Sequence, residues 1–185
     1  MPPVNSNDPR TNRNLPSAVV ERRSWISRPA GFMLALELAL ADSRQDGESL
    51  AILVLQPDVA LSCGGADVAS GLESAAEWTN LAKRLRLALG RYTLLARFPD
   101  QRFVVLRREL SLVRAAALAD RLRVAAELHF LGRPNATTVS AGVACGPIRG
   151  NWTPDQLLEF ASLGCRHAQI AGGNRKVCSG WPAGR

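Results

Sequence analysis

The amino-acid sequence predicts an α+β fold in which helices pack on a single mixed β-sheet. The first observation is an order of apolar patterns along the chain: helix, strand, helix, hairpin, helix, strand, helix and a short last strand. The second is that strands separated by helices need crossovers, whereas a hairpin joins antiparallel neighbours. One sheet must then hold both kinds of connection. With 185 residues and no visible repeat, the chain is expected to form one domain with its own core.

The first half of the chain supplies a helix, a strand and a second helix. Residues 1–22 are rich in Pro, Asn, Ser and Arg and are expected to be a disordered segment or linker, with the domain at 23–179 and a flexible tail at 180–185. A helix is predicted from Phe32 to a breaker at Gly47. Its apolar side chains are dense enough to predict burial on more than one face: Phe32, Leu34, Leu36, Leu38 and Leu40.

A continuous apolar run at residues 50–56 then predicts a fully buried strand. A connection that contains Gly and Ser, residues 62–74, follows it. The next helix is indicated by apolar residues at three- and four-residue spacing, and Gly90 is expected to end it: Trp78, Leu81, Leu85 and Leu89.

The second half opens with a hairpin. Residues 94–106 read LLARFPDQRFVVL, two apolar runs around a turn at Phe98-Pro99-Asp100-Gln101, where Pro suits the second position of a type I turn. A helix with apolar residues at helical spacing comes next, formed around Leu112, Ala115, Ala119, Leu122 and Ala126.

The remaining elements are a strand, a helix and an edge. Residues 137–145 alternate as a strand does, and Thr153-Pro154-Asp155-Gln156 has the residues of a capped helix start. Gly172 and Gly173 end that helix, and residues 175–178 could form a closing edge strand. The whole order is close to the ferredoxin-like arrangement with additions.

The composition argues against several classes of function. The net charge of +7 could suit an acidic partner, but aromatic residues are only 5% and none interleave with a basic cluster, so nucleic-acid binding is not favoured. Neither a secretory signal nor an apolar run of about 20 residues is present, so a cytoplasmic protein without a membrane span is expected. His129 and His167 stand alone, and Trp181 is expected to be exposed in the tail. No C-x-x-C spacing of a zinc or redox site occurs among the cysteines Cys63, Cys145, Cys165 and Cys178.

Several of these fragments, taken together and in order, resemble the GGDEF domains of the diguanylate cyclase family. The hairpin is similar to that family's V-A-R-Y-G-G-D-E-F-A-V-L, and TVSAGVA at 138–144 is similar to its T-V-S-I-G-V-A strand. ADRLR at 119–123 resembles its A-E-R-L-R, and residues 157–175 follow its closing helix and G-R-N. The likeness spans Trp25 to Cys178 and implies a nucleotidyl-cyclase-like fold, a central mainly antiparallel sheet surrounded by helices.

The resemblance also implies a chemistry. An active member joins two GTP molecules into cyclic di-GMP as a dimer with one GTP in each half-site. Carboxylates hold two divalent cations near the triphosphate, and a glycine pair in the hairpin lets backbone N–H groups approach the phosphates. The family's product-binding R-x-x-D corresponds here to Gly90 and Thr93, with Arg91 one residue out of register.

Most of the groups that this chemistry needs are replaced. The glycine pair falls on Pro99 and Asp100, and the two acidic residues of the signature fall on Gln101 and Arg102. The other metal carboxylate, at the end of the first strand, falls on Gln56, so the vestigial metal positions are Gln56 and Gln101. The next Asp of that motif survives as Asp58, which we interpret as a polar residue at a strand end. The late phosphate-binding Lys falls on Gln169 and the Arg of G-R-N on Gly173. The resemblance therefore implies no catalytic residues and no metal or other cofactor.

Three hypotheses follow. The favoured one is a catalytically inactive GGDEF-domain protein that acts as a regulatory or protein-interaction module in cyclic di-GMP signalling. The family's habits then suggest HD-GYP or EAL phosphodiesterases, PilZ proteins or active cyclases as partners. The alternative is a receptor that binds GTP or cyclic di-GMP without turnover, with Arg91, Arg97 and Arg102 as candidate phosphate contacts. Residual diguanylate cyclase activity is the least favoured.

Overall fold

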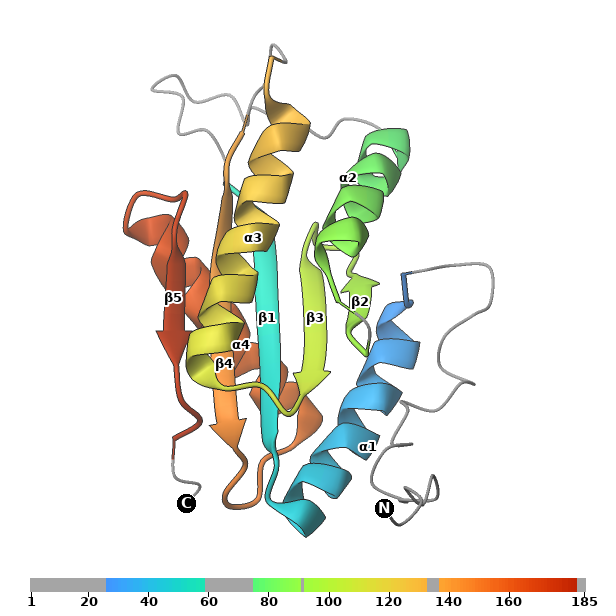
Figure 1. Cartoon of the computed structure of the whole chain (residues 1–185), viewed down its shortest axis with the longest axis vertical. Coiled ribbons are helices and arrows are strands. Elements are labelled where there is room, and N and C mark those ends of the chain that lie inside the picture. Colours follow the sequence, from blue (N-terminus) through green and yellow to red (C-terminus); the bar gives the residue numbers. More distant parts are fainter. Residues whose placement is uncertain (1–25, 59–74, 91, 133–136, 183–185) are drawn as a thin grey trace, which may run out of the picture.

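A mixed β-sheet of five strands forms the centre of the structure, a computed structural model that describes residues 26–58, 75–90, 92–132 and 137–182. Four helices accompany the sheet in those residues (Figure 1). The elements are α1 (Pro29–Asp46), β1 (Ser49–Pro57), α2 (Ala75–Ala88), β2 (Leu94–Arg97), β3 (Phe103–Arg108), α3 (Leu112–Phe130), β4 (Val139–Pro147), α4 (Pro154–Ile170) and β5 (Lys176–Ser179). This is the order that the sequence predicts. The predicted connection at 62–74 lies outside the described residues.

The strand order is β2-β3-β1-β4-β5, so the continuous apolar run becomes the central strand. β1 pairs antiparallel with β3 and with β4, and Leu53 lies opposite Val105 on one side and Val143 on the other. β2 and β3 are antiparallel as well, and among the five strands only β4 and β5 pair in parallel, through the crossover helix α4. The predicted α+β class with a mainly antiparallel sheet is confirmed.

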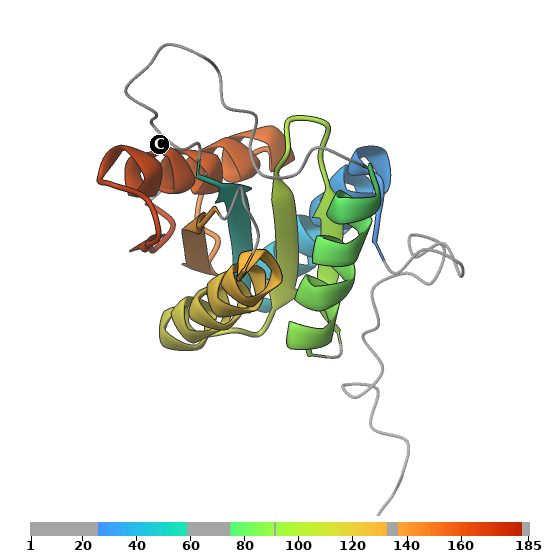
Figure 2. The ribbon, with the colours of Figure 1, turned by 90° about the horizontal axis from the view of Figure 1, so that it is seen from above.

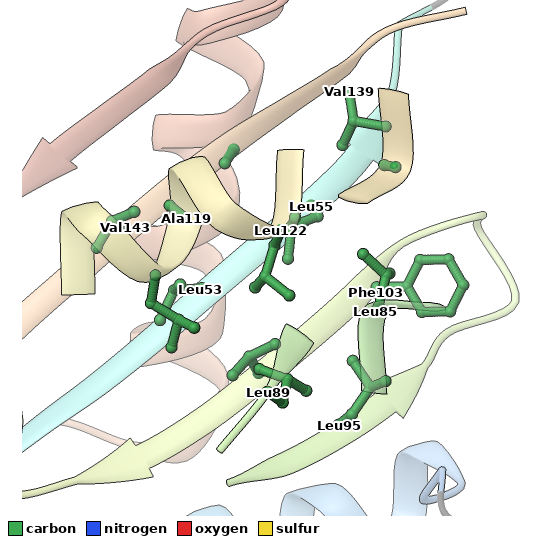
Figure 3. Packing of buried hydrophobic residues seen from close by; sticks show 14 of the residues in the cluster. Leu53, Leu55, Leu85, Leu89, Leu95, Phe103, Ala119, Leu122, Val139 and Val143 are labelled. Carbon is green, nitrogen blue, oxygen red and sulfur yellow. The ribbon is translucent and has the colours of Figure 1, made fainter. Parts of the chain in front are cut away.

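Helices cover both faces of the sheet, α2 and α3 on one side and α1 and α4 on the other (Figure 2). Alternate side chains of β1 enter the two cores: Leu53 and Leu55 pack on the α2/α3 side, and Ile52 and Val54 pack on the α1/α4 side. Figure 3 shows the first of these cores, with Leu122 of α3 beside Leu55. Because β1 meets apolar side chains on both faces, its sequence is apolar at nearly every position.

α1 buries one face and not several. Leu34 and Leu38 are 51% and 39% exposed, whereas Phe32, Leu36 and Leu40 are buried. Apolar residues at every second position suggested a helix buried on more than one side. A helix turns by roughly 100° per residue, however, so that spacing carries successive leucines around the axis and places two of them away from the sheet. The prediction of burial on more than one face is therefore wrong for α1.

β4 also differs from its pattern. All residues from Val139 to Cys145 are buried, although the sequence alternates in polarity. The strand lies between β1 and β5 and has helices over both faces, so its small and polar side chains are covered too. Gly142 in its middle lies directly against the backbone of α4.

The helix ends follow the sequence signals. Gly47 ends α1 with a left-handed φ of 73°, and its N–H donates to the Ser43 carbonyl at 3.0 Å. Thr153 and Gln156 form the predicted capping box at the start of α4. None of the helices in the described part of the chain is long and apolar enough to cross a membrane.

Trp181 is not the exposed tail residue that was predicted. Its indole Nε1 donates to the carbonyl oxygen of Leu50 at 2.9 Å, and the side chain is only partly exposed. The ring packs 5.7 Å from that of Phe160 and 6.3 Å from that of Trp152, measured between centroids. An aromatic cluster thus covers the start of β1, and packing reaches Trp181.

Candidate functional site

The end of β1 and the turn between β2 and β3 meet at one end of the sheet. β1 and β3 run antiparallel with Leu55 opposite Phe103, so the residues after Leu55 lie beside the turn that precedes Phe103. This places Gln56 beside the segment Pro99–Arg102, and Asp58 follows two residues further along the chain.

The turn is a short hairpin connection without glycine. The Phe98 N–H donates to the Arg102 carbonyl at 2.8 Å, which leaves Pro99, Asp100 and Gln101 as the connecting residues. Gln101 has a φ of 63°, and a left-handed third residue is usual in hairpins with three connecting residues. The hairpin is confirmed. A non-glycine residue in this conformation costs roughly 1 kcal/mol, and Pro99 has no N–H to offer a ligand.

Arg102 directs its charge into the fold. Its Nη2 lies 2.5 Å from the Asp100 carboxylate, and its Nη1 donates to the Ser162 hydroxyl of α4 at 2.7 Å. The guanidinium also lies 5.8 Å from the centre of the Phe98 ring. Arg102 therefore makes three internal contacts, and the one with Ser162 joins the turn to α4.

Gln169 and Gln56 also bind protein groups. The Gln169 Nε2 of α4 donates to the Pro57 carbonyl at 3.1 Å, and the Gln56 Nε2 makes a long contact of 3.5 Å with the Asp100 carbonyl. Both side chains thus place an amide nitrogen, a donor, against backbone oxygens. Neither amide nitrogen can act as a ligand for a cation.

Asp58 fastens the loop after α4 to the end of β1. Its Oδ2 accepts hydrogen bonds from the Thr138 hydroxyl at 2.6 Å and from the Asn174 backbone N–H at 2.8 Å. Gly173 packs so closely that a Cβ there would lie 2.9 Å from the Asp58 Cγ. Asp58 is a strand-end polar residue, as predicted, and it connects three separate segments.

This donor set does not fit a pair of divalent cations. Mg²⁺ and similar ions are held by carboxylates, and two of the positions concerned carry the neutral amides Gln56 and Gln101. The remaining carboxylate, Asp58, accepts two hydrogen bonds through Oδ2, and its buried Oδ1 has no hydrogen-bond partner among the described residues. One carboxylate does not supply the ligands that two divalent cations need. In the described parts of the chain, no three His, Cys, Asp or Glu side chains gather as a metal site would need.

Comparison with known proteins identifies which solved structures share this fold. No protein-family model and no curated protein matches the sequence. Among solved structures, the GGDEF domain of YfiN (TpbB) from Pseudomonas aeruginosa superposes with a TM-score of 0.67 at 24% identity, over 83% of this chain and 97% of that one. A shortened form of the same protein that comprises only the GGDEF domain reaches 25% identity and a TM-score of 0.66, over 86% and 95% of the two chains. The active GGEEF domain of a diguanylate cyclase from Vibrio cholerae gives 0.66 at 16% identity, over 83% and 97%. The chain folds as a GGDEF domain.

In this fold, two of the candidate phosphate contacts lie on opposite sides of the sheet. Arg97 lies on the α2/α3 side of the sheet, where its guanidinium is 4.9 Å from the centre of the Trp78 ring. Arg102 reaches Ser162 on the opposite side. Arg91 lies outside the described residues. Thr93, at a product-site position, is buried, and its hydroxyl accepts from the Arg107 Nη1 at 2.9 Å.

The sequence alone did not identify three polar partners of the site, namely Ser162, Thr138 and Asn174. Ser162 is buried on the inner side of α4, where a serine among apolar neighbours gives little signal. Thr138 and Asn174 lie next to the strand and turn patterns that were recognised, but their bonds to Asp58 span 80 and 116 residues of chain. Pairing over such separations depends on the order of the strands in the sheet.

Three cysteines and both histidines lie within the described residues. Burial raises the pKa of the Cys145 thiol to about 11 and that of Cys165 to about 12, so both stay protonated at neutral pH. Burial raises the pKa of Cys178 as well. Cys63 lies outside the described residues. His129 is buried edge-on against the Phe130 ring, and His167 is exposed.

Proposed function

We propose that this chain is a catalytically inactive GGDEF-fold protein that acts as a regulatory or protein-interaction module in cyclic di-GMP signalling. The observation that carries the proposal is the turn Pro99–Arg102, whose charged groups pair with each other and with α4. A cyclase would need the same place for a triphosphate and two cations. The chain has the cyclase fold, but the side chains at the positions that would touch a nucleotide make contacts within the protein instead.

Electrostatics supports the absence of turnover. The Arg102 guanidinium pairs with the Asp100 carboxylate at 2.5 Å, so these two residues together offer no net positive charge where phosphate oxygens would lie. The amides at 56 and 101 supply no charge to offset a triphosphate or to lower the pKa of an attacking hydroxyl through a metal. Asp100, Gln56 and Gln101 therefore each disfavour the metal-assisted reaction of a bound triphosphate.

A role through a protein partner agrees with what is known of a similar structure. The diguanylate cyclase SiaD from Pseudomonas aeruginosa, solved in complex with its activator SiaC, matches this chain with a TM-score of 0.67 at 18% identity, over 84% of this chain and 59% of that one. By analogy we propose a protein partner, and HD-GYP or EAL phosphodiesterases, PilZ proteins and active cyclases are the candidates.

The test is a cyclase assay with GTP and either Mg²⁺ or Mn²⁺, with the product measured by chromatography. An active GGDEF protein serves as the positive control. No cyclic di-GMP above the no-protein blank is expected. Turnover that is lost on Asp58→Ala, while Thr138→Val keeps it, would overturn the proposal, because it would assign chemistry to the one carboxylate that remains.

A second measurement separates a scaffold from a receptor. Isothermal titration calorimetry with GTP-Mg²⁺ and with cyclic di-GMP is expected to show no binding at micromolar concentrations, because Arg97 and Arg102 face opposite sides of the sheet. Micromolar binding that Arg102→Ala abolishes would instead support a non-catalytic receptor.

A further inference from the structure

α3 has a second apolar face, which points to solvent. The first face lies on the sheet, with Ala119 and Leu122 in the core shown in Figure 3. On the outer side, Val124 is the least exposed of the large side chains at 52%, and Val113 is the most exposed at 79%. With the exposed Ala117 and the C-cap residue, these side chains form a line that we call the outer stripe: Val113, Ala117, Val124, Leu128 and Leu131.

The outer stripe has the spacing of a contact between helices. At roughly 100° per residue its five positions fall within about 60° of one another, on the side opposite the core. Ala117, Val124 and Leu131 repeat every seven residues, as the contact positions of paired helices do. A helix that covers a sheet needs only one apolar face. A second apolar line, about five turns long, therefore indicates a surface that another helix covers.

Basic residues without ion-pair partners lie on one side of the outer stripe. That side is the α2 side, because the opposite side is fixed by Asp120, whose carboxylate pairs with a lysine of β5. Arg114 and Arg121 are exposed there. α2 packs beside α3 (Figures 1 and 2) and adds the exposed Lys83 and Arg84. In the described part of the chain, no carboxylate pairs with any of these four side chains.

The β5 side of the outer stripe has no such excess of positive charge. Asp120 is shared by Lys176 and by Arg123, whose Nη1 lies 3.4 Å from the carboxylate. Glu127 is exposed on the same side, so the four charges there cancel. Glu77, the acidic residue of α2, lies in the first turn of that helix and makes an interaction of its own. The outer face of α2 and α3 is therefore basic along one side of the stripe and close to neutral along the other.

We propose that the outer stripe is the docking site for an amphipathic helix of a partner protein, a helix with one apolar face and one acidic edge. The apolar face lies on the stripe, and the acidic edge faces the four cations of the α2 side. Arg114 and Arg121 are seven residues apart, so carboxylates at the same spacing on the partner helix meet both. Complementary charge of this kind selects the partner and fixes the direction in which its helix lies.

This inference gives the protein partner of the proposed function a surface and a chemistry, and it rests on that part of the proposed function. It concerns the α2/α3 side of the molecule and does not depend on whether nucleotide is bound or turned over.

An acidic helix suits this face better than an anionic membrane or a second copy of α3. A flat anionic surface would cover both sides of the stripe, and the exposed Glu127 would then face lipid phosphates. A helix is only about 10 Å wide and can lie over the stripe and its α2 side alone. α3 of a second copy does not supply the acidic edge, because both oxygens of Asp120 are already paired.

The first experiment measures the binding of two synthetic peptides to the full chain by fluorescence anisotropy. Both peptides carry a line of leucines at helical spacing, and one has glutamates along one edge where the other has lysines. We expect the glutamate-edged peptide to bind at least roughly tenfold more tightly than the lysine-edged one. Val124→Glu should weaken its binding at least roughly tenfold, since a charge would be buried between two apolar helices. Leu163→Glu is the matched control, because Leu163 is a 41% exposed leucine of α4 on the other side of the sheet.

The second experiment reverses the charges beside the stripe. Arg114→Glu combined with Arg121→Glu should reverse the preference, so that the lysine-edged peptide binds more tightly. Arg28→Glu combined with Arg149→Glu is the matched control, because it changes the net charge equally at two exposed arginines outside α2 and α3. This control should keep the preference for the glutamate edge. High salt should reduce the preference, and circular dichroism checks that each variant folds.

Four results would overturn the proposal. They are failure of both peptides to bind at millimolar concentration, equal binding of the two peptides, binding that Val124→Glu leaves unchanged, and a preference that the two arginine pairs alter equally or not at all. Binding to vesicles of anionic lipid by a chain that binds neither peptide would assign the face to a membrane instead. Peptide binding involves no turnover of GTP, so failure of this inference and failure of the proposed function are distinguishable.

Discussion

Replacing Gly142 by alanine tests the contact that holds α4 on the sheet. A Cβ at Gly142 would lie 2.0 Å from the Ala161 carbonyl oxygen and 2.4 Å from the Cys165 nitrogen, both backbone atoms of α4. Ordinary contact begins at about 3.4 Å, so α4 would have to move off β4 by about 1.4 Å. No side-chain rotation can relieve the clash, because both partners are main chain.

The free energy of unfolding should fall by about 3–5 kcal/mol. Overpacking a core costs roughly 1–3 kcal/mol when side chains can yield, and here a whole helix must shift instead. Moving α4 outward also separates Leu157 and Ala168 from the sheet, and a gap of 0.5–1 Å already loses about a quarter to a half of a dispersion contact. A loss of this size lowers the Tm of a protein of this length by about 10 °C.

Chemical denaturation with urea, followed by circular dichroism, measures the change, and two other glycines give matched controls. Gly164→Ala places a Cβ 3.3 Å from the Gly142 Cα inside a helix, where alanine is favoured by up to about 1 kcal/mol, so a small effect is expected. Gly47→Ala has open space but a φ of 73°, and should cost about 1 kcal/mol. If Gly142→Ala costs no more than Gly47→Ala, the close approach of β4 and α4 is not as described.

Three further changes probe other parts of the fold. Burial raises the pKa of Cys165 from 9.0 to about 12, so above pH 9 the folded chain keeps a proton that the unfolded chain releases. Stability should therefore fall above pH 9, by about 1.4 kcal/mol per pH unit for this one thiol. Cys165→Ala should remove that contribution, as measured by urea unfolding at pH 8 to 11. Trp181→Ala should cost about 2 kcal/mol by the same assay, and Trp181→Phe only about 1 kcal/mol, because phenylalanine keeps the aromatic packing and loses just the bond to the Leu50 carbonyl. Arg108→Ala should destabilise by about 2 kcal/mol at low salt and less at 1 M salt, since it leaves three carboxylates, Asp42, Asp46 and Glu48, without the cation they share.

The sequence predicted what depends on near neighbours in the chain. Gly47 and the capping box at Thr153 act within one helical turn, so their residues can be recognised without the fold. The central strand could be recognised because covering both faces of a strand requires an apolar run. The order of elements followed from these signals, and the resemblance then supplied the mainly antiparallel sheet.

Errors arose where burial is decided by distant segments. Leu34 and Leu38 are exposed because α1 meets the sheet with one face only, and leucine density does not show which face that is. Trp181 is packed because it reaches Leu50, 131 residues away. A tail that contains Gly and Pro is predicted to be exposed when such a contact is not known. In the site, the turn residues were predicted in place, whereas the bond from Arg102 to Ser162 needed the position of α4.

The contacts at the end of β1 hold this part of the fold together through pairs between the protein's own groups. In a binding site, charged side chains left without a ligand are costly, because desolvated charges need partners. Here Arg102 has Asp100 and Ser162, and Asp58 has Thr138 and Asn174. These pairs join the turn, β1, β4 and the loop after α4, so the region is held together by the protein itself. Replacing Pro99 and Asp100 by glycine would remove the carboxylate that pairs with Arg102, and is therefore expected to weaken the hairpin.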